Sequence, residues 1–196
     1  SMVAPVPFDY EKFMFKEEIS KFLMENNIPE PQTYNLFLNK DQVYKGYESP
    51  LRIEGHKDVE ILGVECRPIK LEDTVLGWYW FCVTSYEGVL PTKCWQRCMR
   101  LRKSNIQIGE ADCISNHPKR GISLWREERG NNYFIGEVHA LDDDLTPNSR
   151  RDYFNQDDAC RQFESALTEE FAGLYELYRY ASVLRNKNKA ISSANQ

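Results

Sequence analysis

The chain has 196 residues, of which 41% are hydrophobic and 13% aromatic, enough to build a sizeable core in one domain or two small ones. Its 30 acidic and 25 basic residues give a net charge of −5, which provides no long-range attraction for a polyanion, so nucleic acid is not an expected partner. No apolar run approaches the length that spans a bilayer, and no secretory signal opens the chain, so we expect a cytoplasmic protein without a membrane partner.

The N-terminal third predicts a helix followed by a hairpin. Ser1 and Met2 resemble a cloning remnant, which suggests a piece of a longer protein. Residues 12–25 place apolar side chains on one helical face, and Asn26-Asn27-Ile28-Pro29 ends the pattern. Residues 34–39 and 42–47 then predict two strands around a turn at 40–41.

The middle of the chain predicts the sheet. Residues 59–71 and 75–86 are long strand candidates, and the second is apolar on both faces, as in a strand covered on both sides. Pro68 in the first requires an edge or a bulge, because proline cannot donate to a ladder. Residues 97–108 and 131–141 are two further strand candidates.

The last third predicts one long helix. From about 157 to 184, apolar residues recur at three- and four-residue steps, with acidic residues early and basic residues late. Such a helix covers a sheet or projects to join another domain, and residues 192–196 are expected to fray. The predicted fold class is α/β (α+β), a mixed sheet packed with helices.

The cysteines are expected to be reduced thiols, because a chain of this size does not need disulfide staples. The six are Cys66, Cys82, Cys94, Cys98, Cys113 and Cys160. The alternative is a zinc site from Cys94, Cys98, Cys113 and His117, although the C-x3-C spacing differs from the usual C-x2-C turn.

The stretch EVHALDDDLTPNSRRDYF, residues 137–154, combines acidic residues, a histidine and two adjacent arginines, and is therefore the first candidate for a functional site. On a strand, Glu137 and His139 point to one face, and Asp142 with the two following aspartates could add oxygen ligands for magnesium, manganese or zinc. This would make a metal-dependent hydrolase. Against it, consecutive aspartates at a strand end usually shape a solvated turn, and no second histidine-carboxylate cluster completes the site.

The same stretch also suits a phosphate. Ser149 and Asp152 form an S-x-x-D capping arrangement, which predicts a short helix from Arg150. A helix start with Arg150 and Arg151 would favour an anion, and an arginine can stabilise a γ-phosphoryl group in a transition state. The alternative is that both arginines pair with residues 142–144 on the surface.

A family resemblance favours the phosphate interpretation. The run GEVHALDDDLTPNSRRDYF, with LRKSNIQIGE upstream, resembles the middle domain of the ninety-kilodalton heat-shock protein family, and more closely the bacterial heat-shock-like members of the GHKL ATPase superfamily. In the chaperones an acidic turn leads to Leu-Asn-Leu-Ser-Arg-Glu and an amphipathic helix. Asn148, Arg151 and Asp152 take the places of that Asn, Arg and Glu, and Asn155 falls where the family often has Gln. YNLFLN, GVECRPIKL and GWYW extend the similarity more loosely.

The resemblance implies a fold, a function and partners. The fold would resemble the second domain of ribosomal protein S five, over residues 1–154, with a helical extension over 155–196. Arg151, with Arg150 as competitor, would reach the γ-phosphate of ATP held with magnesium by the protein's own N-terminal nucleotide-binding domain. Client proteins, and a homodimer through the helical regions, are further implied partners. The residues expected to support the loop are Asn148, Ser149, Asp152 and Asn155.

The superfamily's nucleotide-binding motifs are not found in these residues. The Asp-x-Gly-x-Gly loop does not occur, and the letters of the Glu-x-x-x-Asn box occur only at 127–131 and 128–132, across Gly130 in an expected turn. We therefore expect this chain alone neither to hold ATP well nor to hydrolyse it.

The remaining alternative is a stand-alone protein-interaction module with no nucleotide role. Trp95 and Trp125 lie near basic residues in the sequence and could form an exposed aromatic and basic surface. The basic residues are Lys93, Arg97, Arg100 and Arg126. Trp80, among neighbours that are apolar on both faces, is instead expected in the core.

Overall fold

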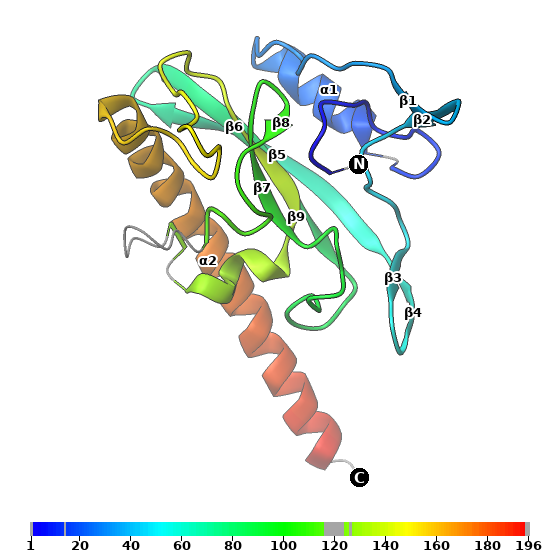
Figure 1. Cartoon of the computed structure of the whole chain (residues 1–196). Coiled ribbons are helices and arrows are strands. Elements are labelled where there is room, and N and C mark those ends of the chain that lie inside the picture. Colours follow the sequence, from blue (N-terminus) through cyan, green and yellow to red (C-terminus); the bar gives the residue numbers. More distant parts are fainter. Residues whose placement is uncertain (1, 14, 116–123, 126, 195–196) are drawn as a thin grey trace.

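The computed structural model describes residues 2–13, 15–115, 124–125 and 127–194. The fold is mixed α+β: a five-stranded sheet has the long C-terminal helix on one face and the N-terminal region on the other (Figure 1). The elements are α1 (Lys16–Glu25), β1 (Leu36–Leu38), β2 (Asp41–Val43), β3 (Leu51–Ile53), β4 (His56–Val59), β5 (Ile61–Leu71), β6 (Thr74–Thr84), β7 (Cys98–Lys103), β8 (Ile106–Gln107), the 3₁₀ helix η1 (Glu128–Tyr133), β9 (Ile135–Ala140) and α2 (Asp158–Ala194).

The sheet has the strand order β5-β6-β9-β7-β8. β7 and β9 are parallel, and the other neighbours are antiparallel. β5 lies at an edge, so the expectation for Pro68 is confirmed. The remaining strands form two hairpins, β1–β2 and β3–β4.

β6 is buried on both faces, as its continuous apolar sequence predicts. Because side chains alternate along a strand, Trp78 and Trp80 pack with α1 residues, whereas Tyr79 and Phe81 pack with α2 residues. The sheet therefore separates two hydrophobic cores.

α2 begins where Asp157 caps it: the Asp157 side chain accepts a hydrogen bond from the Cys160 backbone N–H at 3.0 Å. The buried face of its first half belongs to the same core as the sheet, so this core extends across the expected boundary between residues 154 and 155. The buried α2 residues are Cys160, Phe163, Ala166, Leu167, Phe171, Leu174, Tyr175 and Tyr178. The C-terminal half of α2 projects past the sheet (Figure 1).

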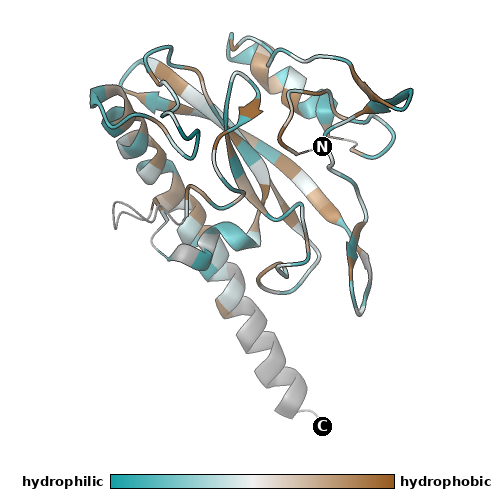
Figure 2. Cartoon of the chain, viewed as in Figure 1, coloured by the Kyte–Doolittle hydropathy of each residue, from teal (hydrophilic) through white to brown (hydrophobic). Residues whose placement is uncertain are grey.

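A hairpin, β1–β2, lies within the range predicted for one, but its strands are shorter than the expected 34–39 and 42–47, and its turn is at 39–40 instead of 40–41. It presents Leu36, Phe37 and Leu38 to solvent, as the brown ribbon at that hairpin shows (Figure 2). The β3–β4 hairpin was not predicted, although Gly55, with φ +80°, marks its turn.

Candidate functional site

Residues 146–155, the arginine loop, form a closed turn and not the start of a helix. Pro147 and Phe154 form an antiparallel bridge, and the Asn148 N–H donates to the Tyr153 carbonyl at 2.8 Å. Arg151 has φ +54°, the left-handed region that a right-handed helix cannot continue through. The helix expected from Arg150 was therefore a wrong prediction, and the chain becomes helical only at α2.

Asn148, and not Ser149, organises this turn. The Asn148 side-chain oxygen accepts the Arg150 N–H at 3.2 Å, and its amide nitrogen donates to the Asp152 carboxylate at 2.6 Å. Ser149 is exposed. At the base, the Asn155 side chain donates to Thr146 Oγ1 at 2.9 Å. Three of the four expected support residues thus hold the loop from within.

The loop is also attached to the body of the domain. The Arg151 carbonyl accepts the Gly109 N–H at 2.8 Å, just after β8. Gly109 has φ +63°, and a Cβ there would overlap the Asp152 carbonyl oxygen, so this approach requires glycine. Tyr153 and Phe154 are buried in the α2-side core. The arginines consequently sit on a loop that is fixed on both sides.

Arg150 and Arg151 are both exposed, and within the described ranges their side chains have no ion pair or hydrogen-bond partner. The neighbouring acidic residues are engaged elsewhere. The Asp142 carboxylate accepts the Asp144 N–H at 3.0 Å, and an Asp143 carboxylate oxygen lies 4.0 Å from Lys103 Nζ. The expected surface pairing between the arginines and the aspartates is not formed.

A second site, which we call the Glu137 cluster, lies buried on the α1-facing side of the sheet. The Oε2 atom of Glu137 accepts a hydrogen bond from Lys45 Nζ at 2.7 Å and lies 2.9 Å from His139 Nε2. Its Oε1 lies 2.6 Å from Arg102 Nε and accepts the Tyr47 hydroxyl at 3.1 Å. All five side chains are almost fully buried. Two cations, a phenol and an imidazole thus converge on one carboxylate.

Burial and these neighbours fix the protonation states. Burial alone would raise the pKa of Glu137, but Arg102 and Lys45 hold it well below its ordinary value. Burial lowers the pKa of His139 to about 4, although Glu137 opposes this shift. At neutral pH His139 is therefore uncharged, and because a carboxylate only accepts, Nε2 carries the proton and Nδ1 is an acceptor. Burial also lowers the pKa of Lys45 to about 7.

The metal interpretation of Glu137, His139 and Asp142 is not supported. Lys45 and Arg102 occupy the two Glu137 oxygens, and their positive charge opposes a cation there. In the part of the chain that the structure describes, no three histidine, cysteine, aspartate or glutamate side chains are grouped to hold a metal ion.

The residues of the alternative zinc site show no metal-site geometry in the described ranges. The six cysteines are free. Burial raises the pKa of Cys98 to about 11 and that of Cys113 to about 12, which disfavours the thiolates that zinc requires. His117 lies outside the described residues.

The expected surface around Trp95 and Trp125 is not formed either. Trp125 is buried and stacks on Phe171, with ring centroids 4.3 Å apart. Trp95 is 47% exposed, but Arg100 is buried and donates to the Trp95 carbonyl. Arg126 lies outside the described residues. Sequence reasoning left a surface position for Trp125 open, because basic neighbours in sequence do not reveal which core a side chain enters.

Sequence reasoning also missed Lys45, Tyr47 and Arg102. In β7 the alternation of Arg100 and Arg102 with Met99 and Leu101 was a usable signal, because it places two arginines on one face of a buried strand. Lys45 and Tyr47 lie in an irregular segment after β2, although a strand was predicted over 42–47, and nothing in that pattern indicates that a lysine there is buried.

No family model, curated protein or solved structure matches this chain. Among the described helices, none is both long enough and apolar enough to cross a membrane.

Proposed function

We propose that this chain is the middle, transducer-type domain of a bacterial, cytoplasmic heat-shock-like GHKL ATPase, with a fold like the second domain of ribosomal protein S five. In this proposal Arg151, or Arg150 beside it, contacts the γ-phosphate of ATP. The nucleotide and its magnesium are held by a separate nucleotide-binding domain. Client proteins and a second copy, joined through the helical regions, are further proposed partners.

The arginine loop is the observation that carries the proposal. A guanidinium that acts on a phosphate in another domain must be exposed, unpaired and held in place. Arg150 and Arg151 are exposed without a side-chain partner among the described residues. Their backbone is fixed by Asn148 and by Gly109. The left-handed conformation of Arg151 costs on the order of 1 kcal/mol, and such strain is often found at functional positions.

The chemistry follows from guanidinium geometry. An arginine stays charged at every physiological pH and can donate two parallel N–H bonds to phosphate oxygens. Its contact strengthens as negative charge develops on the transferring phosphoryl group, so it lowers the barrier more than it improves ATP binding. Because the loop and the first half of α2 share one core with the sheet, domain closure at the loop would move α2 with it.

The test is ATP turnover in a protein that contains this chain together with a nucleotide-binding domain. If Arg151 is the acting residue, Arg151→Ala lowers kcat by about 10³-fold or more while the Kd of ATP changes only a few-fold. Arg150→Ala is the neighbouring comparison, and Arg161→Ala, at the exposed start of α2, is the control outside the loop. A large loss in Arg150→Ala alone would assign the role to Arg150. Normal turnover in both loop variants would refute the proposal.

A protein-interaction module without a nucleotide role is the second candidate, because the exposed β1–β2 hairpin favours it. Phe37 and Leu38 are 64% and 68% exposed, an apolar pair of the kind that marks binding surfaces. Normal turnover in both arginine variants, with loss of a partner in Phe37→Asp, would support this candidate instead.

A further inference from the structure

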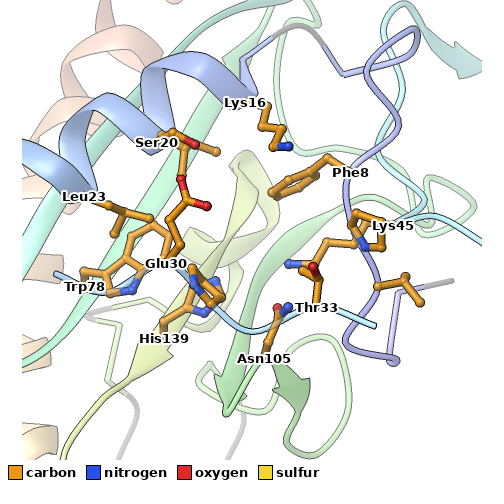
Figure 3. Close-up of a pocket in the computed structure, with 14 residues that line it drawn as sticks. Phe8, Lys16, Ser20, Leu23, Glu30, Thr33, Lys45, Trp78, Asn105 and His139 are labelled. Atoms are coloured by element: carbon orange, nitrogen blue, oxygen red, sulfur yellow. The ribbon is translucent and has the colours of Figure 1, made fainter. Parts of the chain in front are cut away.

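A small pocket opens between the N-terminal segment, α1 and the α1-facing side of the sheet (Figure 3). Its cavity volume is about 90 Å³, far below that of a typical cofactor site. Charged, polar and aromatic side chains share its lining, among them Lys16, Ser20, Lys45, Trp78, Asn105 and His139. Lys45 and His139 belong to the Glu137 cluster, so the pocket borders that cluster directly.

The surroundings of the pocket carry excess positive charge. Among the described residues, the buried ionisable side chains beside the neutral His139 include Lys45, Arg100, Arg102 and Glu137, three basic groups against one carboxylate. The pKa of Lys45 is about 7, and an anion bound beside it would favour its charged form. The two arginines donate to backbone carbonyls, which satisfy hydrogen bonds but do not neutralise charge. In the lining, Lys16 adds an ammonium group and Glu30 adds a carboxylate, so the excess of basic over acidic side chains is unchanged. An anion entering here would meet favourable electrostatics from several sides.

Two lining side chains have buried polar atoms without a hydrogen-bond partner among the described residues: Trp78 Nε1, a donor, and Asn105 Oδ1, an acceptor. Asn105 is only 2% exposed, and its Nδ2 donates to the Gln32 carbonyl at 2.9 Å, which fixes the amide orientation. Buried polar atoms are normally satisfied, so a ligand in the pocket could supply an acceptor for Trp78 Nε1 and a donor for Asn105 Oδ1. His139 Nδ1 offers a second acceptor on a ring that stacks against Trp78.

We propose that this pocket binds a small carboxylate that carries a hydroxyl or amino group next to the carboxyl group. The carboxylate would contact the ammonium groups of Lys45 and Lys16, and the hydroxyl or amino group would donate to Asn105 Oδ1. The volume of about 90 Å³ limits the ligand to a few heavy atoms, the size of glycolate or glycine. A simple anion fits the charge but leaves Asn105 Oδ1 unpaired.

The direct readout is the indole N–H signal of Trp78 in a ¹H–¹⁵N NMR spectrum. The chain has only four tryptophans, so the signal can be assigned with Trp78→Phe. Glycolate and glycine are titrated separately to distinguish a hydroxyl from an amino donor. Acetate, which lacks the donor, and ethanolamine, which lacks the carboxylate, are the comparison ligands. We expect a saturable shift with glycolate, with glycine or with both. Acetate should bind at least about tenfold more weakly, and ethanolamine should cause no saturable shift.

A pocket-filling variant separates binding here from binding elsewhere. Ser20→Leu introduces a larger side chain from α1 into the pocket, and Lys21→Leu places the same residue on an exposed position of α1 as the control. Unfolding midpoints near that of the parent chain establish that both variants fold. We expect Ser20→Leu to weaken binding at least about tenfold and Lys21→Leu to retain it.

Three results would overturn the proposal. One is the absence of a saturable shift up to about 10 mM glycolate or glycine, because an efficient ligand of this size should have a dissociation constant below that concentration. Another is equal affinity for acetate and glycolate, which would remove the role of Asn105. The third is unchanged binding in Ser20→Leu, which would place the ligand outside this pocket.

Discussion

Replacing Glu137 by Gln tests the electrostatic account of the core most directly. The substitution keeps the size of the side chain but removes the charge that Lys45 and Arg102 share. Arg102 then remains buried and charged without a carboxylate, and Lys45 loses the partner that favours its charged form, because each side chain is less than 4% exposed. Removing one partner of a buried ion pair typically costs about 3–5 kcal/mol, since the remaining charge stays desolvated.

The loss is large against a total stability of about 5–15 kcal/mol for a domain. At about 2–4 °C per kcal/mol for a chain of this length, the midpoint of thermal unfolding should fall by roughly 10 °C. Urea unfolding at pH 7, followed by circular dichroism, gives the free-energy difference. The matched control is Glu65→Gln, which breaks the exposed pair with Arg67 and should cost less than about 1 kcal/mol.

A double substitution identifies the cause. If the basic side chains left without a carboxylate are responsible, adding Lys45→Met to Glu137→Gln should recover part of the lost stability, because a buried amine that has lost its charged partner is replaced by an apolar side chain. A Glu137→Gln chain as stable as the parent, within about 0.5 kcal/mol, would show that the cluster is not energetically coupled and would refute this reasoning.

Three further outcomes follow from the same structure. Burial lowers the pKa of His139 from 6.5 to about 4, so between these values the unfolded chain binds a proton that the folded chain does not. The free energy of unfolding should therefore fall as the pH drops from 6.5 to about 4, and it should fall less steeply in His139→Phe. Arg151→Gly should be more stable than Arg150→Gly by about 1 kcal/mol in urea unfolding, because only Arg151 has a positive φ; equal values would contradict the strain. Gly136→Ala should cost at least about 3 kcal/mol, since its Cβ would overlap the Trp80 carbonyl oxygen, whereas exposed Gly173→Ala in α2 should gain up to about 1 kcal/mol in the same assay.

Periodicity predicted the elements that are long or strongly patterned. The apolar run of β6 and the amphipathic face of α2 were confirmed, because burial on a regular element leaves a repeating signal. A hairpin after residue 34 was also confirmed, although its first strand is exposed. The predicted helix at Arg150 failed for a local reason. Asn148 and the left-handed Arg151 form a turn that the S-x-x-D pattern resembles in sequence but not in backbone conformation.

The Glu137 cluster could be predicted only in part. Strand alternation correctly placed Glu137 and His139 on one face, but the metal interpretation assumed that the face was open to ligands. Two of the partners of Glu137 are Lys45 and Tyr47, which lie about ninety positions earlier in the chain. No local sequence pattern predicts so distant a contact. A carboxylate and a histidine on one strand are compatible with a metal site or an ion-pair network, and the residues from other elements decide between them.

The two faces of the sheet point to different roles. Toward α2, the buried side chains of β7 and β9 are apolar, which is the arrangement that stability alone favours; they are Met99, Leu101, Val138 and Ala140. Toward α1, the same two strands bury charge, although well-packed apolar residues of similar volume are often equally or more stabilising than a buried ion pair. Stability therefore does not account for the charged face. Its unpaired Trp78 and Asn105 atoms border the small pocket, so ligand binding gives this costly arrangement a physical reason.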